Sequence, residues 1–87
     1  IHAHPELCFQ ETRTADVIAK ALTDWGLEVH RGLGRTGVVG VVRNGSSPRA
    51  VGLRADIDAL PMTEHNRFAH ASRHPGRMHA CGHDGHT

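Results

Sequence analysis

A shortage of large apolar side chains limits the folds that this chain can adopt. Among its 87 residues only Trp25, Phe9 and Phe68 carry large aromatic rings, and aromatic side chains normally supply the largest buried areas of a core. A domain of this length buries about two-thirds or less of the surface that its unfolded chain exposes. The sequence therefore predicts at most one small domain with a marginal core. Because the first residue is Ile1 and a helix is expected to begin near Thr87, we interpret the chain as a fragment.

Charge and hydropathy argue against two classes of partner. The chain has ten Lys and Arg residues and nine Asp and Glu residues, spread along its length, and a net charge of +1. It therefore has no basic stripe that could bind nucleic acid. No apolar run approaches the roughly 18 residues that span a bilayer, and no signal segment leads the chain. We therefore expect no nucleic acid, no membrane and a cytoplasmic location. Cys8 and Cys81 are expected to be reduced thiols rather than a disulfide.

One helix is predicted in the first third of the chain. Apolar side chains recur at helical spacing at Val17, Ile18, Ala21, Leu22 and Trp25. This spacing predicts a helix over residues 12–25. Thr12 or Thr14 is expected to cap its start, and Gly26 to end it.

Short strands are expected after the helix. Residues 27–30 can form one strand, and residues 38–42 are rich in β-branched side chains. The turn signal at residues 44–45 precedes a second extended run at residues 50–58, which predicts a hairpin between the two runs. Residues 62–82 show no sustained period, as is typical of functional loops or of segments held by partners.

A glycine motif at residues 32–37 spells G-x-G-x-x-G, and Asp56 follows about 20 residues later, as in dinucleotide-binding folds. That fingerprint requires a helix directly after the glycines, whereas a β-branched run follows here. The motif is therefore interpreted as a loop that joins two strands, with glycines supplying positive φ angles.

Two carboxylates share one face of the predicted strand at residues 51–58. Side chains alternate there, so Arg54, Asp56 and Asp58 lie on the same side. Ligand sites gather at the carboxyl ends of strands, which would suit paired acids. The alternative is a solvated face on which Arg54 pairs with Asp56, and the pattern alone slightly favours that alternative.

Histidines concentrate near the end of the chain, alongside Cys81. Six of the nine lie in the last 23 residues, namely His65, His70, His74, His79, His83 and His86. In an extended segment Cys81 and His83 point the same way and can reach one metal or two adjacent metals. A single C-x-H pair is at most part of a metal site, and a His-rich polar loop is the alternative. Cys8 is interpreted as a small buried hydrophobe rather than a ligand.

Four ordered motifs cover nearly the whole chain. They are HAHPEL at residues 2–7, TGVVG at 36–40, LRADIDALPM at 53–62 and MHACGHDGHT at 78–87. In order and spacing they resemble the M20 family of metal-dependent amidohydrolases, from the branch that includes hippurate hydrolases and indole-acetyl-amino-acid hydrolases. Cys8 and Gln10 depart mildly from the first motif, at positions that bind no metal in the family.

The resemblance implies an α/β fold, in which residues 1–87 form the N-terminal segment of a zinc-exopeptidase-like catalytic domain, a helix followed by strands. It implies that Cys81 and His83 bind paired divalent metals (Mn, Zn, Co or Ni), and that Asp58 orients the site without binding metal. Asp56 stands where many relatives have a metal-binding His, so its role as a ligand is open. The other ligands and the general-base Glu are expected outside the chain.

The implied activity is hydrolysis of N-acyl amino acids, such as hippurate-like amides, to a carboxylic acid and an amino acid. Two metals would polarise the amide carbonyl and activate a water. The fragment alone is expected to be inactive, and homo-oligomerisation of the full-length enzyme is left open. The alternatives are a small autonomous His/Cys metal-binding module without catalysis and a scaffold that binds no metal.

Overall fold

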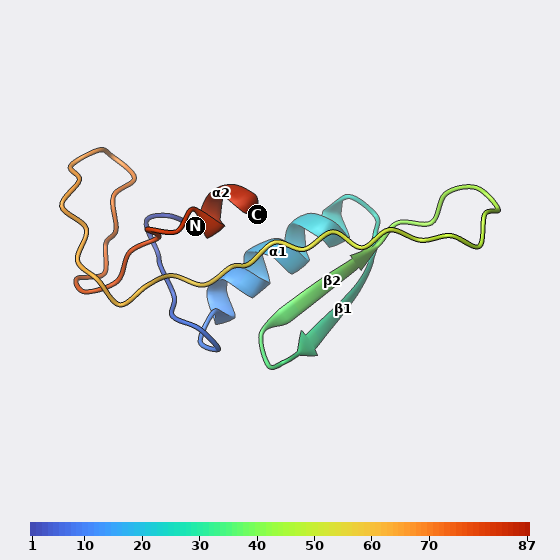
Figure 1. Cartoon of the computed structure of the whole chain (residues 1–87), viewed down its shortest axis with the longest axis horizontal. Helices are drawn as coiled ribbons and strands as arrows, with labels where there is room; N and C mark the ends of the chain where they lie inside the picture. Colours follow the sequence, from blue (N-terminus) through green and yellow to red (C-terminus); the bar gives the residue numbers. More distant parts are fainter.

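Helix α1 (Thr12–Asp24) is the longest element of the computed structural model, which describes residues 1–87. Strands β1 (Glu28–Leu33) and β2 (Gly37–Val41) follow it, and a one-turn helix, α2 (His83–His86), lies near the C-terminus. Helix α1 packs along both strands, as Figure 1 shows. The predicted helix and the predicted order of a helix followed by strands are confirmed.

The start of α1 is capped by a residue from the preceding loop. The Glu6 carboxylate accepts hydrogen bonds from the backbone N–H of Arg13 (2.9 Å) and of Thr14 (2.7 Å), and from the Thr14 hydroxyl (2.7 Å). The N-cap position itself is Glu11, whose side chain caps nothing. The prediction that Thr12 or Thr14 caps the helix is therefore wrong: Thr14 lies inside the first turn and donates to the residue that does cap it.

Replacing Glu6 by Ala is expected to destabilise the protein by about 1–2 kcal/mol. The N–H groups of the first turn have no acceptor within the helix, so they lose their hydrogen-bond partner when the Glu6 carboxylate is removed. Partial burial raises the pKa of Glu6, but the hydrogen bonds from Thr14 and Arg13 outweigh burial and lower it, so the cap is a carboxylate. Hydrogen exchange of the Arg13 and Thr14 amides measures the effect. The exposed Glu28→Ala is the control, and equal exchange rates in both variants would refute this account of the cap.

The end of α1 follows the expectation for Gly26. Gly26 adopts φ 78°, its N–H donates to the Thr23 carbonyl, and the Leu27 N–H donates to the Leu22 carbonyl (3.0 Å). This pair of bonds is the Schellman arrangement, which favours glycine because its φ is positive. The chain therefore turns sharply from α1 into β1.

Strands β1 and β2 form an antiparallel hairpin in which Glu28 pairs with Val41 and His30 with Val39. The first of them confirms the strand predicted at residues 27–30 and extends it to Leu33. Residues 34–36 make the turn, so the glycine motif does join two strands, as interpreted.

The hairpin predicted between residues 38–42 and 50–58 is wrong. Strand β2 pairs with β1 instead, and residues 50–58 form no strand. Figure 1 shows the loop after β2 leading away from the sheet before the chain returns. Alternating apolar residues favour an extended conformation, but a strand also needs a backbone partner, and none lies beside this run. Leu53 is accordingly 96% exposed.

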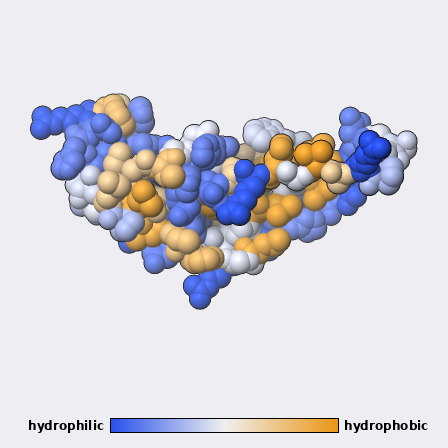
Figure 2. Space-filling view, in the orientation of Figure 1, coloured by the Kyte–Doolittle hydropathy of each residue, from blue (hydrophilic) through white to orange (hydrophobic).

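The core is as small as the composition predicts. Its buried apolar side chains are Ala15, Ala19 and Ala59, whereas Trp25 is 73% exposed. Figure 2 shows apolar residues on the visible surface. Cys8 is exposed and Cys81 is exposed, both as free thiols. The interpretation of Cys8 as a buried hydrophobe is therefore wrong, because nothing in the chain covers this loop.

Residues 62–82 are irregular, as predicted. Leu60 and Met78 close the segment by exchanging two backbone hydrogen bonds, of 2.9 and 3.0 Å. The chain ends of this loop therefore meet, and residues 79–87 return towards the N-terminal turn. No helix in the structure has the length and apolar character needed to cross a membrane.

Candidate metal centre

An open groove of about 750 Å³ brings together three of the four motifs picked out in the sequence. Its walls come from the loop before α1, from α1, from the turn between β1 and β2, from residues 53–58 and from α2. Asp56, Asp58 and His83 all line it. The extended run at residues 53–58 therefore places its two carboxylates beside α2, although it forms no strand.

The clearest contact in the groove joins His83 to Asp58. His83 Nδ1 lies 2.9 Å from Asp58 Oδ1 and 3.0 Å from the Asp58 carbonyl oxygen. Both are hydrogen-bond acceptors, so Nδ1 carries the proton and donates. In the neutral ring the lone pair is then on Nε2, the atom that can bind a metal. Both side chains are partly buried, with exposed fractions of 17% and 28%.

Asp56 has a different partner. Its Oδ1 accepts hydrogen bonds from Arg54 Nε (2.9 Å) and Nη2 (2.6 Å). The hydrogen bond from Arg54 holds the pKa of Asp56 below its usual value. The structure therefore contains the pairing of Arg54 with Asp56 that the sequence analysis gave as the alternative.

Cys81 does not line the groove with His83. Gly82 adopts φ 82° and turns the chain into α2, so the extended conformation expected for residues 81–83 is wrong. No group of three or more His, Cys, Asp or Glu side chains is gathered closely enough to hold a metal ion. A thiol and an imidazole with a free Nε2 are nevertheless donors that zinc and related divalent metals prefer. The donors on this chain fit part of such a site.

Sequence reasoning missed one contact between the first and last motifs. His2 Nδ1 lies 2.7 Å from Asp84 Oδ2, although the two residues are 82 positions apart. Both residues belong to motifs that were recognised, but their spacing in the chain gives no sign that they meet. His79, in the last motif, is buried, and neither of its ring nitrogens has a hydrogen-bond partner.

Comparison with curated proteins finds close relatives over the full chain. It is 51% identical over 87 residues to a hippurate hydrolase of Campylobacter jejuni, covering 100% of this chain and 23% of that protein. It is 50% identical over 88 residues to an N-acyl-L-amino acid amidohydrolase of Geobacillus stearothermophilus, covering 100% and 24%. An IAA-amino acid hydrolase ILR1-like 5 of Arabidopsis thaliana is 45% identical, with 100% and 20% covered. The chain thus spans less than a quarter of the length of these relatives.

A solved structure and a family model agree with these relatives. The YXEP protein of Bacillus subtilis, described as a dinuclear metal-binding peptidase from the M20 family, matches with a TM-score of 0.88 and 38% identity, over 95% of this chain and 23% of that one. The model of peptidase family M20/M25/M40 matches residues 52–87. These findings confirm the resemblance drawn from the motifs, and they identify the chain as a segment of the M20 peptidase family.

Proposed function

We propose that this chain supplies two metal ligands, Cys81 and His83, to an amidohydrolase that cleaves N-acyl amino acids. Residues 1–87 are then the N-terminal segment of its catalytic domain. The observation that carries the proposal is the contact of Asp58 with His83 Nδ1, which leaves Nε2 free to bind a metal. A ligating histidine commonly donates its other N–H to a carboxylate in this way.

Each residue has a defined part in this proposal. Asp58 accepts the Nδ1 proton, fixes the ring of His83 and makes its Nε2 a better donor. Cys81 binds as a thiolate, so its proton leaves when the metal binds. Together with ligands from outside these residues, Cys81 and His83 would hold divalent metals (Mn, Zn, Co or Ni), which would supply a Lewis acid and lower the pKa of a bound water. The general base and the remaining ligands come from outside these residues.

The substrate class comes from the names of the relatives. Hippurate hydrolase and N-acyl-L-amino acid amidohydrolase both act on amides formed by an amino acid. We propose that the full-length protein hydrolyses such small molecules to a carboxylic acid and an amino acid. A cytoplasmic location stays a prediction.

Hydrolysis of hippurate tests this proposal. The full-length protein that carries residues 1–87 is stripped with a chelator, reloaded with manganese, zinc, cobalt or nickel, and assayed for released glycine. We expect turnover that returns with metal, and none from residues 1–87 alone, because a catalytic zinc normally has three protein ligands. The proposal would be contradicted if the full-length protein hydrolysed no N-acyl amino acid. It would also be contradicted if residues 1–87 alone hydrolysed hippurate and Cys81→Ala abolished that activity.

A further inference from the structure

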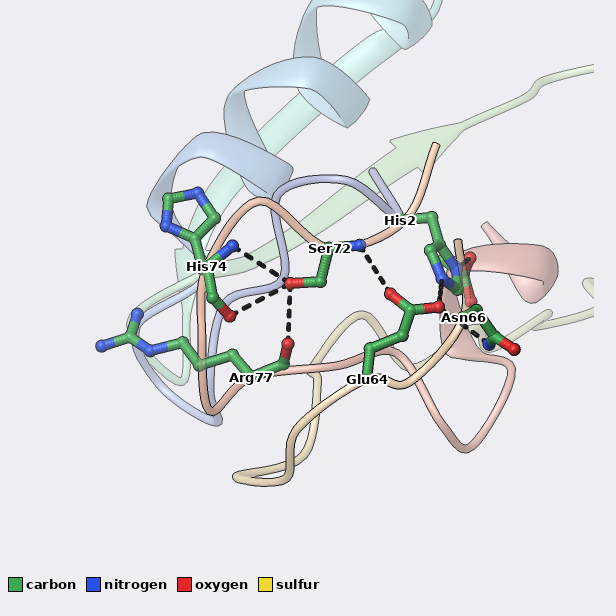
Figure 3. Close-up of polar contacts among 7 residues, drawn as sticks. His2, Glu64, Asn66, Ser72, His74 and Arg77 are labelled. Atoms are coloured by element: carbon green, nitrogen blue, oxygen red, sulfur yellow. Dashed lines mark hydrogen bonds and ion pairs between the residues drawn. The ribbon is translucent and has the colours of Figure 1, made fainter. Parts of the chain in front are cut away.

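His2 lies between two carboxylates that come from distant parts of the chain. Its Nδ1 is 2.7 Å from Asp84 Oδ2, and its Nε2 is 3.1 Å from Glu64 Oε1, a contact drawn in Figure 3. Ionised carboxylates only accept hydrogen bonds, so both ring nitrogens donate. The hydrogen bond to Glu64, helped by Asp84, raises the pKa of His2 against the opposing effect of burial. His2 therefore bridges the two acids.

Glu64 is the fixed end of this bridge. Only 3% of its side chain is exposed, and its carboxylate also accepts hydrogen bonds from the Ser72 backbone N–H (2.5 Å) and from Asn66 Nδ2 (2.9 Å). These bonds, that from Ser72 first, lower the pKa of Glu64 to about 2. The Ser72 hydroxyl in turn donates to the Arg77 carbonyl (2.7 Å), as Figure 3 shows. Glu64 is thus held by the irregular loop that it belongs to.

Asp84 connects His2 to the candidate metal ligands, because it directly follows His83 in α2. This helix has four residues and no side-chain cap. One turn cannot hold its own conformation in water, because helix nucleation is unfavourable. Its orientation must come from contacts with other parts of the chain. Asp58 holds His83 on one side, and His2 holds Asp84 on the other.

The His2 ring also touches the chain on the other side of Cys81. It packs against His79, with ring centroids 6.2 Å apart, and edge-on against Phe68 at 5.6 Å. His79 is only 4% exposed, so its position is fixed by packing. His2 thus contacts residues 79 and 84, which flank residues 81–83.

We propose that His2 is a positioning residue for the metal-binding segment: through Asp84 and His79 it fixes the path of residues 81–83, and Glu64 anchors it. The inference rests on the proposed function, because it assumes that Cys81 and His83 bind metal. His2 itself has no free ring nitrogen and binds no metal. Ligand geometry must be held within a fraction of an ångström, and partners that orient ligands are commonly worth 10–100-fold in metal affinity.

The test measures Co²⁺ binding by the full-length protein, using the affinity and the absorption spectrum of the Co²⁺ form. We expect His2→Ala to raise the Kd for Co²⁺ on the order of 10-fold and to shift the spectrum, since the thiolate and imidazole then meet the metal in a different geometry. His30→Ala is the matched control: it removes an exposed histidine that also bonds a glutamate, Glu28 at 2.9 Å, but far from α2. It should leave both readouts unchanged.

A second variant keeps the test decisive if His2→Ala does not fold. Asp84→Ala removes the carboxylate that accepts from His2 Nδ1 but keeps the His2–Glu64 contact, and it should raise the Kd as His2→Ala does. The double variant should be no worse than either single one, because both remove the same link. If folded His2→Ala has the wild-type Kd and spectrum, the positioning role alone is overturned. If His2→Ala does not fold, the same result in Asp84→Ala overturns it. A wild-type protein that binds no Co²⁺ overturns the proposed function and this inference together.

Discussion

Replacing Cys81 or His83 by alanine in the full-length protein is expected to remove most of the bound metal and nearly all hydrolysis. Each change deletes an atom that would bind metal directly, so its effect should exceed the 10–100-fold typical of residues that only orient a ligand. A cysteine binds metal as a thiolate, so protons compete with the metal for this ligand. The metal affinity of the wild-type protein should therefore weaken as the pH falls. Metal analysis of the purified variants and a hippurate assay measure both effects.

Two controls match these variants in chemistry. Cys8→Ala removes the other exposed thiol, and His30→Ala removes an exposed histidine of β1. Both should retain metal, because neither side chain is a proposed ligand, although Cys8 lines the groove. Near-normal metal content in both Cys81→Ala and His83→Ala would rule out these residues as ligands.

Asp58→Asn is expected to leave the fold intact and to lower turnover about 10–100-fold. The amide keeps the shape of the side chain, but it accepts the Nδ1 proton of His83 without the charge that makes Nε2 a strong donor. The Asp58 carbonyl still accepts a hydrogen bond from the same nitrogen, which limits the loss. Steady-state kinetics and the Kd for metal give the result.

Glu28→Gln makes the same kind of change at an exposed site on β1 and is the control. If Asp58→Asn matched it in kcat and in metal affinity, Asp58 would be an ordinary groove residue and the account of His83 would lose its support.

Local signals in the sequence were enough for the elements whose causes are local. The spacing of apolar residues gave the right position for α1, and Gly26 marked its end because a positive φ there suits glycine. The cap could not be predicted in the same way. Glu6 reaches the first turn from a loop several residues upstream, so the usual signal, a Ser, Thr, Asp or Asn directly before the helix, pointed to the wrong residues.

Pairing of strands depends on partners that a local pattern does not reveal. Residues 50–58 alternate like a strand, but β2 took β1 as its partner because a short glycine turn joins them. The contacts within the candidate site could not be predicted for the same reason. Asp58 and His83 were each predicted from a motif, whereas their contact, and that of His2 with Asp84, joins residues 25 and 82 positions apart. Only the folded chain shows which motif residues touch.

In the protein to which this chain belongs, Cys81 and His83 are expected to bind metal. Anomalous diffraction from crystals of the full-length protein, recorded on either side of the absorption edge of the bound metal, tests it most directly. We expect metal peaks within bonding distance of Cys81 Sγ and His83 Nε2, about 2.3 Å and 2.0–2.1 Å for zinc, with Asp58 still on Nδ1. Metal peaks bound by other residues, with the Cys81 thiol and the His83 Nε2 left free, would contradict the account.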